Sequence, residues 1–103
     1  MNEVTLCGRI GSTYKERRSK SGQTYIAFAM EVETKERSSF RNIVHILCFR
    51  KPVVDYLKKL NVHEGTPVIV FGNVGSWGDE VKGTRIIQNA VYANKIYVIK
   101  TQA

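Results

Sequence analysis

The chain has 103 residues, of which 43% are apolar and 24% are charged, and its formal net charge is +7 at pH 7. This length predicts a single domain over residues 1–103, and no apolar run approaches the ~20 residues that a membrane-spanning helix needs. The start of the chain has no signal-peptide pattern, and the two cysteines, Cys7 and Cys48, lack metal-ligand spacing. We therefore expect reduced, half-buried thiols in a cytoplasmic protein.

Strand-like patterns occupy the first third of the chain. In residues 2–10 and again in residues 23–33, apolar and polar side chains alternate, which is typical of half-buried strands. Between them, residues 13–20 are polar and basic and fit either a hairpin arm or a loop. The charged, serine-containing stretch from Glu33 to Arg41 is predicted to be a mobile loop.

The rest of the chain predicts one helix among further strands. Residues 42–50 form a strand that is largely apolar on both faces, and Pro52 is well placed at the first position of a helix. Residues 66–76 are predicted to form the next strand. A hairpin tip at 78–83 and a long last strand at 84–99 complete the pattern.

The predicted order is strand, strand, strand, helix, strand, strand, so the helix is expected between the third and fourth strands. This is the order of the OB-fold, an all-β, five-stranded Greek-key barrel. The OB-fold holds oligonucleotides on the face around strands two and three and in the loops one–two and four–five. Basic and aromatic residues of this chain fall on those elements, which favours nucleic-acid binding.

Cationic residues gather beside aromatic and turn residues. Between Arg9 and Lys20, five cations face only one carboxylate, Glu16. Cations track phosphates while rings stack on bases, so this pattern favours a single strand, whereas a duplex reader more often carries a recognition helix. The candidate nucleic-acid contacts are Arg9, Tyr14, Arg17, Arg18, Lys20, Tyr25, Lys35, Arg37, Phe40, Arg41, Phe49, Arg50, Lys51, Trp77, Lys82 and Arg85.

Trp77 is the strongest single candidate for base stacking. It lies between two glycines at the predicted hairpin, whereas a core tryptophan normally lies inside an apolar strand; packing on a partner subunit is the alternative. Phe49 precedes Arg50 and belongs to the strand face opposite the core, so it is a second candidate. Tyr92 and Tyr97 lie in the last strand and are expected to pack or to line an interface.

The sequence indicates no catalytic, metal or cofactor chemistry. His45 and His63 lie far apart with no carboxylate pattern around them, and Asp55, Asp79 and Glu80 form no hydrolytic constellation. The chain also has no phosphate-cradling Gly-Lys-Ser loop. We therefore expect a binding protein without enzyme activity, metal or cofactor.

Several segments carry, in order, a resemblance to a known family. They are Asn2-Glu3-Val4-Thr5-Leu6-Cys7-Gly8-Arg9-Ile10-Gly11, Ser21-Gly22 before Ala27-Phe28, Val44 to Phe49 before Tyr56-Leu57-Lys58-Lys59, Glu64-Gly65-Thr66-Pro67-Val68-Ile69-Val70-Phe71-Gly72, and Gly83-Thr84-Arg85. Over nearly the whole chain this order and spacing resembles the bacterial single-stranded-DNA-binding protein family.

The resemblance implies an OB-fold that binds single-stranded DNA with little sequence preference, in DNA replication, recombination or repair. Phe49 and Trp77 lie near the family's stacking positions, whereas Ile43 stands where a third-strand ring is usual. The printed sequence ends at Ala103 without the family's acidic tail, which is expected either of a tail-less relative such as primosomal replication protein B (PriB) or of a chain cut back to its folded domain. The alternative is therefore a PriB-like primosome component in replication restart, with a helicase partner and DNA as co-ligand.

An apolar outer patch predicts self-association. If Val68, Val70, Gly72 and Val74 face inward, their neighbours in the same strand face outward. An unpaired first strand would add an edge that needs covering, and the resemblance also implies pairing through that strand. We expect a homodimer as the minimum, with a tetramer open, and an interface that includes Val4, Thr5, Cys7, Ile69 and Phe71.

Two rival classes stay open at this point. One is an RNA-binding, cold-shock-like or translation OB protein, although the sheet-face aromatic clusters expected of that class are missing. The other is a structural or scaffold protein. For the preferred interpretation we expect a cytoplasmic, nucleoid-associated location.

Overall fold

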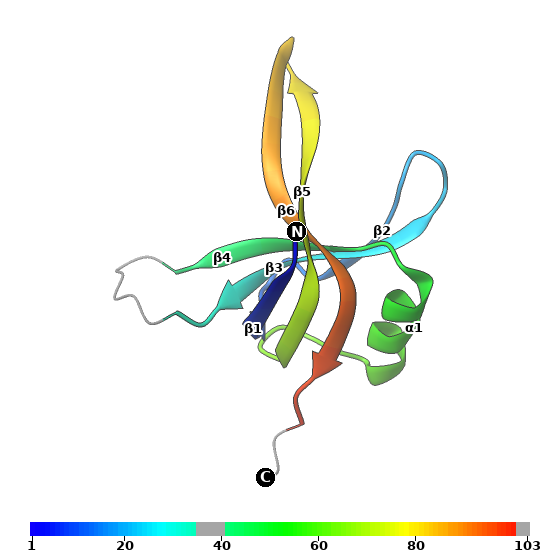
Figure 1. Cartoon of the computed structure of the whole chain (residues 1–103). Coiled ribbons are helices and arrows are strands. Elements are labelled where there is room, and N and C mark those ends of the chain that lie inside the picture. The colour runs from blue at the N-terminus through cyan, green and yellow to red at the C-terminus, as the bar shows by residue number, and fades with distance from the viewer. Residues whose placement is uncertain (35–40, 101–103) are drawn as a thin grey trace.

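A computed structural model describes residues 1–34 and 41–100. The elements in the described residues are β1 (Val4–Ile10), β2 (Lys15–Arg18), β3 (Thr24–Val32), β4 (Ile43–Cys48), α1 (Lys51–Leu60), β5 (Pro67–Val81) and β6 (Thr84–Val98). Figure 1 shows the strands wrapped into a barrel, with α1 at one end and a long β5–β6 hairpin projecting from the body. Residues 35–40 of the loop predicted from Glu33 to Arg41 lie outside the described residues.

The sheet closes through β1. The strand order is β1-β5-β6-β4-β3-β2, and β1 also pairs with β3. Gly8 lies at the junction, because it is paired with Val68 of β5 and with Val32 of β3, and a Cβ there would collide with the Glu31 carbonyl. The closed barrel confirms the predicted OB-fold. The expectation of an unpaired first strand is corrected in part, since Gly8–Ile10 pair with β3 where the barrel closes, whereas Val4–Cys7 pair in the ladder with β5 alone.

The polar stretch at Lys15–Arg18 is a strand, β2, which pairs antiparallel with Thr24–Ala27 of β3. Its four side chains are all exposed, so no apolar alternation marks it in the sequence. Because β2 adds a strand, the helix lies between β4 and β5, and its predicted place between the third and fourth strands is corrected accordingly.

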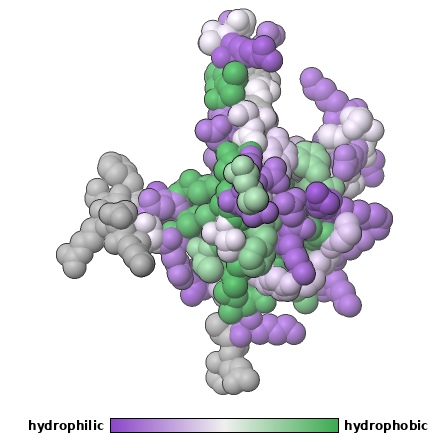
Figure 2. Space-filling view, viewed as in Figure 1, coloured by the Kyte–Doolittle hydropathy of each residue, from purple (hydrophilic) through white to green (hydrophobic). Residues whose placement is uncertain are grey.

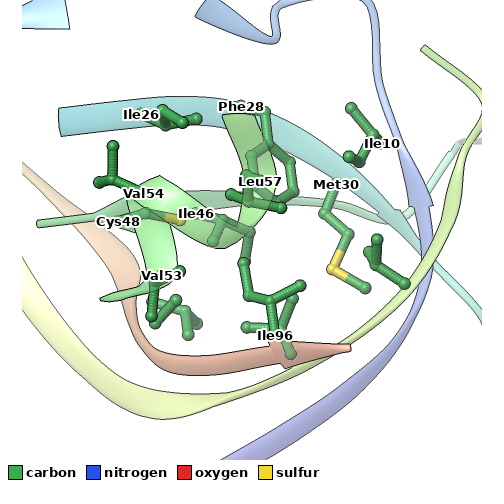
Figure 3. Packing of buried hydrophobic residues seen from close by; sticks show 14 residues of the cluster. Ile10, Ile26, Phe28, Met30, Ile46, Cys48, Val53, Val54, Leu57 and Ile96 are labelled. Carbon is green, nitrogen blue, oxygen red and sulfur yellow. The ribbon is translucent and has the colours of Figure 1, made fainter. Parts of the chain in front are cut away.

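The core gathers inward residues of β1, β3, β4, β5 and β6 together with the buried face of α1 (Figure 3). Ile26, Phe28 and Met30 are at most 2% exposed, as the alternation in β3 predicted. Leu57 of α1 packs into the same cluster. The helix has 10 residues, and no helix in the described part of the chain is long and apolar enough to span a bilayer.

The two cysteines differ sharply, and the expectation of two half-buried thiols was wrong. Cys48 is fully buried in the core, whereas Cys7 is exposed. The difference follows from strand alternation, because Cys48 lies on the inward face of β4 and Cys7 on the outward face of β1. Burial raises the pKa of the Cys48 thiol to about 12.

Beyond the barrel, β5 and β6 continue as a two-stranded arm, defined here as residues 76–89 (Figure 1). The register shifts between Phe71 and Gly72, where β5 leaves the body. Val74, predicted to face inward, is 42% exposed because it lies past this shift, at the base of the arm. The predicted tip at 78–83 was also too wide, since pairing continues to Val81 opposite Thr84.

Asn2 ties the start of the chain to the base of the arm. Its Nδ2 donates to the Val74 carbonyl at 2.6 Å, and the Val74 amide donates to its Oδ1 at 2.9 Å. The side-chain amide of Asn2 therefore makes the two hydrogen bonds that a peptide group of β1 would otherwise make with Val74.

Candidate nucleic-acid interface

A groove of about 590 Å³ lies over the outward face of β3 and β4 and reaches the base of the arm. It is lined by Thr13, Arg17, Tyr25, Ala27, Phe28, His45, Ile46, Leu47, Phe49, Gln88 and Tyr92. None of these lining residues is acidic, so the groove offers apolar and aromatic surface without a carboxylate to repel phosphate. Within residues 1–34 and 41–100, no three His, Cys, Asp or Glu side chains gather where they could hold a metal ion.

Three aromatic rings form a row inside the groove. The ring centroids of Tyr25 and Phe49 are 4.5 Å apart with an interplanar angle of 14°. The centroids of Phe49 and Tyr92 are 6.0 Å apart with an angle of 27°. We call these residues the ring row. Nearly parallel rings in an open groove present the geometry on which nucleic-acid bases stack.

Strand register explains how the ring row is assembled. Ile26 of β3 is opposite Cys48 of β4, and both face the core. Side chains alternate along an extended chain, so the adjacent residues, Tyr25 of β3 and Phe49 directly after β4, point to the groove. The Gln23 side chain also donates from Nε2 to the Phe49 carbonyl at 3.1 Å, which anchors the Phe49 backbone to β3. Two sequence candidates are thus brought together.

Tyr92 is the member of the ring row that the sequence reasoning missed, since it was expected to pack or to line an interface. It comes from β6, and its ring lies against Gly75 of β5, where a Cβ would collide with the ring. A glycine inside a strand often marks the close approach of another group, so Gly75 was the available signal.

Among the predicted cations that the structure describes, Arg17 is the one that lines the groove, and it is opposite Tyr25 in the β2–β3 register. Lys15 is opposite Ala27, another groove residue, and belongs to the same face of β2, although it was not among the candidates. Arg18 alternates to the other face. In Figure 2, hydrophilic residues gather at the tip of the arm, where Lys82 lies, and along the β2–β3 hairpin.

Four further predicted cations contact other residues of the chain and do not line the groove. They are Arg9 with the Gly65 carbonyl at 2.9 Å, Arg41 with Glu31 at 4.0 Å, Arg50 with the Asn94 amide oxygen at 3.2 Å, and Lys51 with Asp55 at 2.7 Å. Arg41 and Lys51 remain largely exposed, so these ion pairs are weak restraints in water.

Tyr14 lies on the other side of β3 from the groove. Its ring packs 6.0 Å from that of Phe28, at an angle of 39°, and it lines a smaller hollow of about 240 Å³ beside Leu57 and Lys58 of α1. Burial, with smaller contributions from Cys48 and Glu16, raises the pKa of its hydroxyl. This placement argues against base stacking by Tyr14.

The remaining candidates cannot be placed as contacts of the groove. Lys35, Arg37 and Phe40 lie outside the described residues. The backbone of Trp77 is paired with that of Gln88, a groove residue, but its side chain is not described. Lys20 lies in the turn of the β2–β3 hairpin, and Arg85 follows the turn of the arm.

A second aromatic cluster lies on the outward face of β1, β5 and β6. The register places Thr5 opposite Phe71, Cys7 opposite Ile69, and Ile69 opposite Tyr97. We call these five residues the outer patch. Phe71 and Tyr97 meet edge to face, with centroids 5.8 Å apart at 90°, and are 37% and 44% exposed. Val4, also predicted at the interface, is half-buried, because the even-numbered residues of β1 face the core.

Comparisons with known proteins agree with this geometry. The profile described as "Single-strand binding protein family" matches residues 1–99. A mitochondrial single-stranded DNA binding protein from S. cerevisiae is similar over 97% of this chain and 96% of that chain, with 21% identity and a TM-score of 0.70. A Plasmodium falciparum SSB in complex with ssDNA is similar over 97% and 96%, with 16% identity and a TM-score of 0.77.

The dimeric N-terminal domain of the PriB protein from Thermoanaerobacter tencongensis is also similar, over 97% of this chain and 98% of that chain, with 22% identity and a TM-score of 0.69. Comparison with curated proteins returned no match. At these identities the solved structures show a shared fold.

Proposed function

We propose that this chain, which belongs to the single-strand binding protein family, binds single-stranded DNA in the groove over β3 and β4 with little sequence preference. The ring row inside the groove, with Arg17 beside it, carries the proposal. Every base has a face that can stack on a ring, and every nucleotide has a phosphate that a cation can contact, so such a site tolerates any sequence.

Cations on the two hairpins that flank the groove support a path for the strand beyond it. The β2–β3 hairpin carries Arg18 and Lys20 beyond Arg17, and the arm carries Lys82 and Arg85 at its tip. A strand lying along the ring row would meet Arg17 at the β2 side, and a strand that continued along either hairpin would meet further cations. The net charge of +7 favours the encounter with a polyanion at low salt.

Self-association through the outer patch is part of the proposal. The patch combines exposed apolar side chains on three adjacent strands, and a two-fold dimer would let the same patch cover itself. The similar PriB domain is dimeric. A dimer of this chain would carry two grooves, and each particle could hold a longer strand.

The test compares binding of fluorescently labelled oligo-dT, oligo-rU and duplex DNA of equal length at the same salt. We expect oligo-dT to bind more tightly than the duplex, because paired bases cannot reach the ring row. Arg17→Glu should weaken oligo-dT binding, while Lys59→Glu, an equal charge change on the exposed side of α1, should not. Equal affinity for the duplex, or tighter binding of oligo-rU, would contradict the proposal.

A PriB-like role in replication restart, with a helicase partner, stays a prediction from the resemblance. Its test is whether the purified chain binds a replication-restart helicase in the absence of DNA. Binding that needs DNA would mean that the two proteins meet only on a shared strand.

A further inference from the structure

We infer that Asn94 is a positioning residue that fixes the direction of the arm relative to the barrel. It does so by bridging Arg50 and Asn73 at the point where the arm leaves the body. Its consequence for binding rests on the proposed function, because the direction of the arm would decide how a bound strand continues beyond the groove.

Asn94 is the extra residue of a β-bulge in β6. Phe71 of β5 is opposite Lys95 of β6. The next residue, Gly72, is opposite Ala93, so the pairing passes over Asn94. A bulge bends its strand and increases the local twist. Because this bulge lies at the base of the arm, its geometry determines the angle at which the arm projects from the barrel (Figure 1).

The side-chain amide of Asn94 makes a hydrogen bond at each of its ends. Its Oδ1 accepts from Arg50 Nε at 3.2 Å, and its Nδ2 donates to Asn73 Oδ1 at 3.1 Å. A guanidinium can only donate, so the Arg50 contact fixes which way round the amide lies and directs its nitrogen to Asn73. We call these two hydrogen bonds the amide bridge.

Arg50 gives the amide bridge a rigid end. It is the N-cap residue of α1, and its carbonyl accepts hydrogen bonds from the amides of Val53 and Val54, both at 3.0 Å. These two valines are buried in the core, so the barrel holds the backbone of Arg50. The Arg50 side chain makes no cap hydrogen bond, which leaves its guanidinium for Asn94.

The other end of the amide bridge is the base of the arm. Asn73 lies directly before Val74, whose backbone is held by Asn2. Besides the strand ladder, side chains therefore attach the base of the arm at two points, from the start of the chain and from the start of α1. A single attachment leaves an element free to pivot, whereas two attachments from different elements fix its direction.

The direction of the arm matters for a strand that extends past the ring row. Gln88 of the arm lines the groove, and Lys82 and Arg85 lie at the tip of the arm. If the arm keeps one direction, a strand that leaves the groove meets these cations without first having to order the arm. The cost of ordering a moving segment would otherwise be subtracted from the binding free energy.

Distances between spin labels test the positioning role without DNA. Nitroxides are attached to Thr84→Cys at the tip of the arm and to Lys59→Cys on α1, in a Cys7→Ser chain whose Cys48 stays buried. The labelled chain is diluted into unlabelled chain, so that only distances within one chain are read. We expect one narrow distance distribution in this parent chain, and a broader or shifted one in Asn94→Ala.

The matched control is Asn89→Ala, the same substitution elsewhere in β6. Asn89 Oδ1 accepts a hydrogen bond from Ser76 Oγ at 3.2 Å, so this contact lies within the arm and its loss should leave the distribution narrow. Asn94→Asp keeps the acceptor for Arg50, and the Asn73 amide can turn round to donate, so this variant should stay narrow as well. An Asn94→Ala distribution identical to that of the parent, or a parent distribution that is already broad, would overturn the inference.

Oligo-dT of two lengths tests the consequence for binding. We choose ~4 and ~16 nucleotides, the two ends of the range that one OB-fold holds, so that the long strand extends onto the arm. Asn94→Ala should weaken binding of the long strand about threefold or more, as expected on losing two exposed hydrogen bonds, and leave binding of the short strand unchanged. Asn89→Ala should change neither affinity.

A merely structural role of Asn94 would weaken binding of both strands equally. Equal losses would therefore refute the inference, as would an unchanged affinity for the long strand. If the parent chain binds neither strand, the proposed function fails, and the distance distributions still decide whether Asn94 fixes the direction of the arm.

Discussion

The groove and the outer patch use similar residues in different arrangements. In the groove, rings from three strands stand nearly parallel in a hollow of about 590 Å³, and Arg17 borders the row. In the outer patch, Phe71 meets Tyr97 edge to face, and Lys95 Nζ already lies 4.9 Å from the Tyr97 ring centroid. Parallel rings leave a face for a flat base, whereas an edge-to-face pair capped by a cation presents a shaped apolar surface. Ring geometry therefore distinguishes the proposed nucleotide site from the proposed protein-contact site, whereas composition does not.

Truncating a core side chain should have the largest effect, because the groove and the outer patch both depend on the folded barrel. Phe28 is 2% exposed and lies beneath the groove, so Phe28→Ala should lower the free energy of unfolding by ~3–5 kcal/mol, as large core truncations do. Urea denaturation measures this loss. Phe71→Ala, on the exposed patch, is the matched control and should cost much less; equal losses would mean that the outer patch is structural.

A charge in the outer patch should separate self-association from DNA binding. Phe71→Glu would bury a carboxylate in a dimer interface and should weaken the dimer by ~1–3 kcal/mol while leaving the groove intact; Lys95, opposite residue 71 on β6, offsets only part of the cost. Sedimentation at micromolar concentration reads the mass against the 11.7 kDa chain. Ile87→Glu, on the exposed arm, should leave the mass unchanged. A wild type that sediments as a monomer would remove the outer patch from the proposal.

Salt dependence should distinguish the groove from the patch more finely. If about five phosphates are neutralised, log K for oligo-dT should fall with log salt at a slope near −3.5, since each phosphate contributes ~0.7 on single strands. Arg17→Glu with Arg18→Glu should flatten this slope, whereas Lys95→Glu, beside the Tyr97 ring of the outer patch, should not. An unchanged slope in the double variant would place the phosphate track away from β2.

Alkylation of the two cysteine thiols should give the smallest effect, because it reports only on the surroundings of each thiol. At mildly alkaline pH iodoacetamide should alkylate Cys7 in the folded chain and spare Cys48, whose buried thiol ionises only near pH 12. If the outer patch pairs, alkylation of Cys7 should slow as protein concentration rises, and Phe71→Glu should abolish the slowing. Concentration-independent alkylation would argue that Cys7 lies outside any interface.

Burial of Cys48 also sets a pH dependence of stability. The thiol ionises at its ordinary pKa of 9.0 once the chain unfolds, but only near 12 in the fold. Between these values the folded state holds a proton that the unfolded state has lost, so the free energy of unfolding should fall as pH rises from about 9 to about 12. Urea denaturation of Cys48→Ala over the same range should show a shallower fall.

The sequence predicts those parts of the fold in which alternation is local. In β3, every second residue from Ile26 to Met30 is buried, and Tyr25 therefore points to the groove as expected. Alternation carries no information where neither face is buried. For that reason the sequence does not distinguish a strand from a loop at residues 13–20, and it predicts a hairpin tip at 78–83 that is wider than the observed turn. Val74 is exposed because the β5–β6 register shifts before it. The sequence of β5 alone carries no signal for such a shift, since it depends on how two strands pair.

The sequence predicts a site of aromatic rings and cations, but it identifies only some of the residues that line the groove. Phe49 and Arg17 were recognisable from rings beside cations, because those residues occupy the groove by the local geometry of β2 and β4. Tyr92 reaches the groove only because β6 pairs parallel with β4, a contact between segments more than 40 residues apart. Arg50 looked like a phosphate contact, but Asn94, brought close by the same pairing, accepts its hydrogen bond.

The two hydrogen bonds between Asn2 and Val74 give the arm an attachment point that the arm itself cannot supply. Residues 81–89 are all exposed, so this stretch rests on ladder hydrogen bonds with no buried layer under it. Amide hydrogen exchange should therefore be graded along the hairpin, fastest next to Lys82 and slowest at Val74. Asn2→Ala should move the start of the protected region into the barrel, and the arm would then open as a longer, independently fluctuating unit. Asn2, two residues before β1, would in that way set the length of hairpin that a bound strand has to order.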